Sequence, residues 1–108
     1  MIDFDTVWNY VIEHRELKSE YSLHGPDHWR RVERHACILA SRTGANLNVV
    51  RLFAVFHDSC RIDDGWDRGH GQRGADYAAK LRGTMFDLAD AEFDQLYYAC
   101  VWHTDAKH

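Results

Sequence analysis

The sequence predicts an all-α fold, a bundle of about five helices. Apolar residues recur at helical spacing along the whole chain, and no segment alternates apolar and polar residues as a half-buried strand does. The chain has one proline, Pro26, and neither an internal repeat nor a low-complexity segment. Its 108 residues, of which 45% are apolar, fit a single compact domain over residues 1–108.

The first two helices are predicted from their apolar stripes and from the residues at their ends. A helix over residues 3–19 has an inward stripe of five members: Phe4, Val7, Trp8, Val11 and Ile12. Gly25 and Pro26 open the second helix, because proline is favoured in a first turn, and this helix ends near Thr43 and Gly44. The residues that we expect it to turn inward are Trp29, Val32, Ala36, Leu39 and Ala40.

The third helix is predicted to be the buried centre of the bundle. Asn46 is its expected cap, and the segment over residues 49–56 is apolar nearly all round. The Gly- and Asp-rich stretch over residues 63–69 is predicted to be a loop, whose acidic residues are most simply solvated. Two more helices are expected, over about 70–82 and about 90–104.

Composition limits the functional classes and the cellular setting. The formal charge of −4, from 17 acidic and 13 basic side chains, argues against a nucleic-acid partner. The three cysteines, Cys37, Cys60 and Cys100, are widely spaced without a C-x-x-C pair, which favours a reducing compartment over a disulfide framework. The N-terminus lacks the pattern of a signal peptide, and no apolar run could span a bilayer. We therefore expect a cytoplasmic protein with no membrane partner.

The most informative feature is the pair His57-Asp58, which directly follows the apolar run of the third helix. Imidazole and carboxylate offer a nitrogen and an oxygen donor to one divalent cation. Burying them at the end of an apolar segment is costly unless something pairs with them. His28 lies upstream, on the edge of the apolar stripe of the second helix. These three donors together predict a metal site, because they cannot all find neutral partners cheaply in a small core.

His70 and His103 are also predicted on inward helix faces. Neither has an adjacent carboxylate, so a metal ligand and a hydrogen-bonded core residue are equally good interpretations of each. His24, in the loop before Pro26, either lines the site or caps the turn. We expect surface or peripheral positions for the remaining histidines, His14, His35 and His108.

The spaced set of His28 and His57-Asp58 resembles the defining pattern of the HD-domain superfamily of metal-dependent phosphohydrolases. Residues 24–32, His-Gly-Pro-Asp-His-Trp-Arg-Arg-Val, are similar to its first-ligand helix, and residues 56–61, Phe-His-Asp-Ser-Cys-Arg, to its second. The likeness covers nearly the whole chain. It implies a helical bundle around a mono- or binuclear centre that hydrolyses phosphate esters or nucleotides, with His28, His57 and Asp58 as metal ligands.

In binuclear branches of the superfamily two further histidines hold a second metal, and His70 and His103 look like these positions. The resulting order resembles the branch that includes bacterial dinucleoside-polyphosphate hydrolases. The resemblance implies one or two divalent metal ions as cofactor, of Mn, Fe, Co, Ni, Zn or Mg. It also implies a small-molecule phosphate or nucleotide substrate as partner, and a homodimer is left open.

The superfamily pattern closes with a separate aspartate on a later helix, which this sequence does not show. Asp105 lies two residues after His103, roughly 200° around a helix from it, and is a poor substitute. The ligand could come from another chain, or the centre could be incomplete. We favour a third interpretation, that a C-terminal portion carrying this ligand is missing, which would weaken metal affinity and activity.

Two residues are predicted to be catalytic. Asp58 would help to orient the attacking water, as the resemblance suggests. Arg61, four residues after His57, could hold a phosphate by its bidentate fork, although a surface arginine that closes a helix is an equally good interpretation. Arg73 and Lys107 are weaker phosphate-binding candidates. Two other classes stay open, a non-catalytic HD-like domain that binds metal or nucleotide as a regulator, and a helical interaction module with core histidines.

Overall fold

The computed structural model describes residues 2–15, 25–62 and 69–103. Within them lie five α-helices: α1 (Phe4–His14), α2 (Pro26–Thr43), α3 (Leu47–Phe56), α4 (His70–Leu81) and α5 (Asp90–Trp102). In these ranges the β structure is limited to one bridge, between Arg82 and Phe86. The predicted all-α bundle of about five helices is confirmed. None of the described helices is long and apolar enough to cross a membrane.

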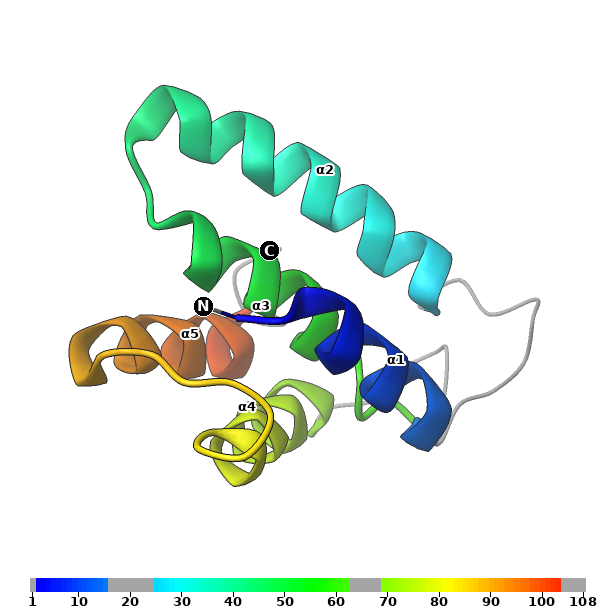
Figure 1. Cartoon of the computed structure of the whole chain (residues 1–108). Helices are drawn as coiled ribbons and strands as arrows, with labels where there is room; N and C mark the ends of the chain where they lie inside the picture. The colour runs from blue at the N-terminus through cyan, green and yellow to red at the C-terminus, as the bar shows by residue number, and fades with distance from the viewer. Residues whose placement is uncertain (1, 16–24, 63–68, 104–108) are drawn as a thin grey trace.

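The helices pack as two hairpins that meet along α3. Helix α2 packs on α3, and α4 packs on α5, while α3 also contacts α5, α4 and α1. Figure 1 shows α3 in the middle, with α2 above it, α1 in front, and α4 and α5 below. The apolar core draws on all five helices, and its largest fully buried side chains include Trp8, Trp29, Phe56, Leu52 and Leu96. The third helix is therefore the central element, as predicted.

Capping residues explain where α2 ends and α3 begins. Gly44 ends α2 in the left-handed conformation, with φ of 77°, and donates its N–H to the Ala40 carbonyl at 2.9 Å. The side chain of Asn46 then accepts from the Val49 N–H at 3.0 Å and caps α3. These two caps follow each other so closely that α2 and α3 must form a hairpin. The predicted end of the second helix near Gly44 and the predicted cap of the third helix at Asn46 are confirmed.

Two details of the predicted helices are wrong. Helix α1 ends at His14, because Arg15 is extended, and the side chains of these two residues bond to carbonyl oxygens of the last turn. Leu39 is 60% exposed instead of inward. The inward face of α2 passes through Trp29 and Ala40, and Leu39 lies about 100° around the helix from Ala40.

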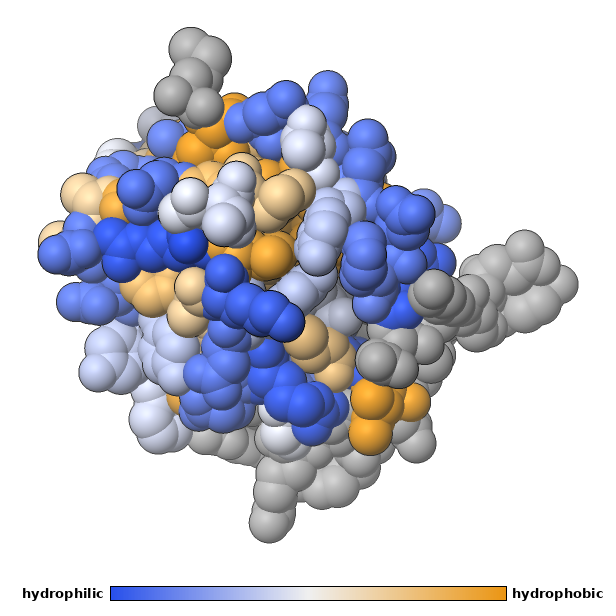
Figure 2. Space-filling view, turned by 60° about the horizontal axis from the view of Figure 1, so that its bottom comes forward, coloured by the Kyte–Doolittle hydropathy of each residue, from blue (hydrophilic) through white to orange (hydrophobic). Residues whose placement is uncertain are grey.

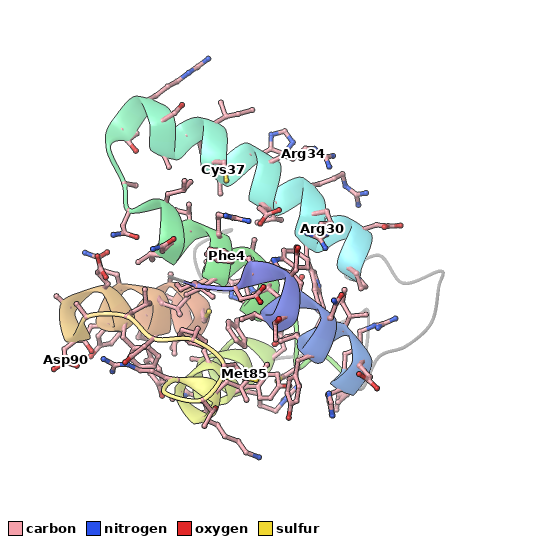
Figure 3. All side chains as sticks on the ribbon, viewed as in Figure 1. Phe4, Arg30, Arg34, Cys37, Met85 and Asp90 are labelled. Atoms are coloured by element: carbon pink, nitrogen blue, oxygen red, sulfur yellow. The ribbon has the colours of Figure 1, made fainter. Side chains whose placement is uncertain are left out.

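Helix α1 is tied to the other helices through charged and aromatic side chains. The guanidinium of Arg30 lies 3.8 Å from the ring centroid of Trp8, and that of Arg51 lies 3.8 Å from the centroid of Phe4. Glu33 pairs with both arginines, at 3.8 and 3.3 Å. Figure 3 labels Phe4 at the start of α1 and Arg30 on the part of α2 beside that helix. The cluster thus fixes α1 against the α2–α3 hairpin.

Helix α4 approaches α3 and α5 closely because two glycines face them. A Cβ atom added to Gly74 would lie 2.5 Å from the backbone oxygen of Phe56, and one added to Gly71 would lie 2.5 Å from that of Cys100. No side chain fits at either distance. The bare backbone of α4 can therefore pack against both neighbours, which brings His70 to the end of α3.

The apolar residues at the surface are scattered. The face in Figure 2 is hydrophilic over most of its area, with apolar residues in small separate groups. The described large apolar side chains that are at least half exposed are Ile38, Leu39, Leu47, Ile62, Tyr98 and Trp102. An open pocket of about 670 Å³ lies between α2 and α3, lined in part by Ile38 and Leu47 and by none of the histidines in the described ranges.

Candidate metal centre

Four histidines and one aspartate meet at the C-terminal end of α3. His28 lies in the first turn of α2, and His57 and Asp58 directly follow α3. His70 begins α4, and His103 directly follows α5. All five are the ligands predicted from the sequence, and the structure brings them together. Their placement needs four helices, which is why residues so far apart in the chain can share one site.

The carboxylate of Asp58 lies between two pairs of imidazoles. Its Oδ2 atom is 3.5 Å from Nε2 of His28 and 3.5 Å from Nε2 of His57. Its Oδ1 atom is 3.1 Å from Nε2 of His70 and 3.5 Å from Nε2 of His103. We name His28, His57 and Asp58 the first group, and Asp58, His70 and His103 the second group. Within each group the donor atoms lie within 4.8 Å of one another.

Backbone hydrogen bonds determine which nitrogen of two rings faces the carboxylate. Nδ1 of His57 lies 3.1 Å from the Phe53 carbonyl oxygen and 3.0 Å from that of Ala54. Nδ1 of His103 lies 2.7 Å from the carbonyl oxygen of Cys100. A carbonyl oxygen can only accept a hydrogen bond, so Nδ1 carries the hydrogen in both rings. In the neutral form of either ring, Nε2 then presents a lone pair toward Asp58.

Burial keeps His57 neutral while Asp58 stays ionised. Burial is the main cause that lowers the pKa of His57 to about 4, against the opposing attraction of the Asp58 carboxylate. Burial alone would raise the pKa of Asp58. The hydrogen bonds that His103 and His70 donate when Nε2 of each ring carries a proton, together with the positive charge of Arg61, hold this pKa well below its usual range. At neutral pH a lone pair of His57 therefore faces an anionic oxygen at 3.5 Å. A cation between the two atoms would turn this repulsion into attraction.

The second group contains the closest approach between two rings. Nε2 of His70 and Nε2 of His103 are 3.0 Å apart, and both lie near Oδ1 of Asp58. Three electron-rich atoms at such distances need at least one proton or cation among them. Imidazole nitrogen and carboxylate oxygen are ordinary ligands of divalent transition metals. The second group therefore has the donors to hold such an ion.

Arg61 contacts the carboxylate and is buried. Its Nε atom donates to Oδ1 of Asp58 at 3.1 Å, and its backbone N–H donates to the Asp58 carbonyl at 3.3 Å. Only 6% of the residue is exposed. The interpretation of Arg61 as a surface arginine is therefore wrong, since the turn after α3 folds its side chain inward onto Asp58.

Two residues that sequence reasoning missed also shape the centre. The ring of Phe53 stacks on His57, with centroids 4.9 Å apart, and meets His103 edge-on at 5.9 Å. Cys100 supplies the carbonyl that orients His103. The spacing of four residues between Phe53 and His57 on one helix could have indicated their contact. The role of Cys100 has no sequence signal, because every residue carries a carbonyl.

The other residues singled out in the sequence lie outside the two groups. Arg73 donates to the carbonyl of Cys60 at 3.0 and 3.1 Å and so braces the turn after Asp58. His14 and His35 are exposed, as predicted. The residues of interest that fall outside the described ranges are His24, Asp63, Asp64, Asp67, Asp105, Lys107 and His108.

Comparisons of the chain with protein-family models, with curated proteins and with solved structures find no match in any of the three. The resemblance to the HD-domain superfamily therefore stays a prediction from the residues that carry it. The functional conclusion rests on the donors, distances and burial of the centre.

Proposed function

We propose that this chain is a metal-dependent phosphohydrolase that acts on a phosphate ester or nucleotide through an activated water. One observation carries the proposal: the buried carboxylate of Asp58 faces an imidazole pair with each of its two oxygens. Each group would hold one divalent ion, and Asp58 would be a ligand in both groups. Paired metal sites of this kind are common in enzymes that transfer or hydrolyse phosphate.

The residues of the two groups fit divalent metal ions as the cofactor. The first group offers two nitrogens, from His28 and His57, and one oxygen of Asp58. The second group offers two nitrogens, from His70 and His103, and an oxygen of the same Asp58. Mixed nitrogen and oxygen donors suit Mn, Fe, Co, Ni or Zn, whereas Mg prefers a shell made of oxygen alone. We therefore expect a transition-metal ion in preference to Mg.

The buried histidines of the centre would hold the ions, whereas the partly exposed histidine would lie where substrate enters. The chemistry that a bound divalent ion supplies is a water of lowered pKa and compensation of the charge on phosphate oxygens. His57 and His70 are almost fully buried, with side chains 5% and 3% exposed, so they would hold their ions from the interior. The side chain of His28 is 31% exposed. Substrate would therefore reach the centre from the side of His28.

The test begins with the metal content of protein purified without an affinity tag. The protein is then loaded separately with Mn, Fe, Co, Ni or Zn and screened for release of inorganic phosphate from nucleotides and from a generic phosphate ester. We expect bound metal and turnover in the wild type, and loss of both in His57→Ala. The matched control is His35→Ala, which changes an exposed histidine on α2 and should alter neither.

The rival classes give different results in the same experiment. A regulatory domain would retain metal but hydrolyse none of the substrates. A helical interaction module would retain no metal, and His57→Ala would change nothing but its stability. If His57→Ala keeps the metal content and phosphatase activity of the wild type, the hydrolase proposal is wrong.

A further inference from the structure

We propose that Arg61 is a positioning residue, whose guanidinium fixes the Asp58 carboxylate so that each oxygen faces one imidazole pair. This inference rests on the proposed function, because Asp58 must be a metal ligand for its orientation to matter. It assigns Arg61 a role different from holding phosphate. Arg61 touches Asp58 and would act through it.

The contact between the two side chains is built within one turn. Nε of Arg61 donates to Oδ1 of Asp58 at 3.1 Å, while its backbone N–H donates to the Asp58 carbonyl at 3.3 Å. The turn itself is closed by Ser59, whose N–H and hydroxyl both donate to the Phe56 carbonyl, at 3.1 and 2.8 Å. These bonds hold the guanidinium and the carboxylate within one turn, and Arg73 of α4 supports the same turn through the Cys60 carbonyl.

A fixed donor on one oxygen determines where the remaining lone pairs of the carboxylate point. The Asp58 side chain turns about two bonds, and each of its oxygens has two lone-pair directions. Arg61 occupies one direction at Oδ1, the oxygen that also faces His70 and His103. Without this bond the carboxylate plane could rotate, and the two oxygens would no longer be aimed at separate imidazole pairs. Partners that orient metal ligands typically change metal affinity about 10–100-fold.

Burial favours positioning over substrate binding. The Arg61 side chain is 7% exposed, and the Asp58 side chain is 4% exposed. A guanidinium that binds phosphate must present its fork to the solvent from which the substrate arrives. Arg61 instead directs its Nε–H at a residue of its own turn. The two roles also predict different defects, in metal affinity for positioning and in phosphate affinity for substrate binding.

The experiment measures metal binding in the absence of substrate. Metal-free wild type, Arg61→Gln and Arg61→Lys are titrated with Co²⁺ by calorimetry, and the visible absorption of the bound Co²⁺ reports its ligand geometry. We expect Arg61→Gln to bind Co²⁺ about 10–100-fold more weakly with an altered spectrum. Arg61→Lys should lie between, because an ammonium donates to one oxygen but lacks the planar guanidinium. Inorganic phosphate is then titrated into each Co²⁺-loaded protein.

Arg73→Gln is the matched control, because it removes another guanidinium that bonds to the same turn, at the Cys60 carbonyl. We expect Arg73→Gln to weaken Co²⁺ binding much less than Arg61→Gln does, because Arg73 donates to a backbone carbonyl of the turn and Arg61 donates to the Asp58 carboxylate itself. The inference is overturned if Arg61→Gln binds Co²⁺ like the wild type, or if Arg61→Gln and Arg73→Gln lose the same affinity. It is also overturned if phosphate affinity alone falls.

Should circular dichroism show that Arg61→Gln is unfolded, Arg61→Lys decides by the same criteria. A wild type that binds no Co²⁺ at all would instead refute the proposed function.

Discussion

The two groups of the candidate centre differ in the parts of the fold that build them. The first group comes from the α2–α3 hairpin alone, since His28 lies in α2 and His57 and Asp58 follow α3. The second group also needs α4 and α5, because His70 begins one and His103 follows the other. The first group contains the most accessible of the four histidines, His28, whereas the second has the closest contact between two nitrogens. One group thus depends on a local hairpin, and the other on how two hairpins pack.

Removing ligands should separate the two groups, with the largest effect at the shared residue. Asp58→Asn should abolish transition-metal binding in both groups, a loss above the roughly 100-fold limit for partners that only orient ligands. His28→Ala and His103→Ala should each remove one ion of two and leave the other bound. Calorimetry with metal analysis gives the stoichiometry. A single variant of either histidine that loses both ions would mean that the groups are one site.

The metal-free protein should lose stability as the pH falls from about 6.5 to 4. Burial lowers the pKa of His57 from 6.5 to about 4, so the unfolded chain binds this proton more readily than the folded chain. The stabilisation is therefore fully present above pH 6.5, and its loss on reaching pH 4 is on the order of 3 kcal/mol. The lowered pKa of Asp58 adds a further loss only below about pH 4. Urea unfolding in chelator at several pH values measures this dependence.

His57→Gln serves as the control for the pH experiment, because it removes the titrating ring from the first group. Its free energy of unfolding should change much less between pH 6.5 and 4. An equally steep profile in His57→Gln would assign the pH dependence to the second group or to other residues.

A smaller effect is expected from closing the space between α4 and α3. In Gly74→Ala the new Cβ would meet the Phe56 backbone oxygen at 2.5 Å, so α4 must move. Overpacking of this kind typically destabilises a protein by about 1–3 kcal/mol. His70 would shift with its helix, so metal affinity should fall in the second group and stay unchanged in the first. The control is Ala79→Ser, on the exposed side of α4, which should leave metal affinity unchanged and stability nearly unchanged. If Gly74→Ala weakened metal binding equally in both groups, the proposed difference between the two groups would be wrong.

Local features of the sequence were enough to predict most of the helix boundaries. Gly44 and Asn46 act on their own helix ends through short-range hydrogen bonds, so residue type and position predict them well. The end of α1 was harder, because Arg15 leaves the helix without a glycine or proline to mark it. Leu39 was misplaced because an apolar residue type does not reveal which side of a helix its neighbours cover.

The set of candidate donors followed from residue type and helical phase, but the geometry of the donors did not. His57-Asp58 and His28 could be recognised because a buried pair of donors needs a partner. That Asp58 would face both imidazole pairs depends on the approach of α4, which Gly71 and Gly74 permit. From the sequence alone, a glycine inside a helix indicates only weak helix propensity. Its role in packing is visible once the helix that lies against it is known. The inward fold of Arg61 likewise depends on the turn that follows α3, which the spacing of residues in the sequence does not reveal.

The five donors are spread along the chain, and this spread affects how metal binding would change the stability of the fold. The donor side chains at residues 28, 57, 58, 70 and 103 belong to segments that the unfolded chain holds far apart. Ions bound between them would act as crosslinks and close long loops, and the entropy lost by the unfolded chain grows with loop length. Bound metal would then hold the two hairpins together. Loss of metal would lower the stability of the fold and would also stop the proposed hydrolysis.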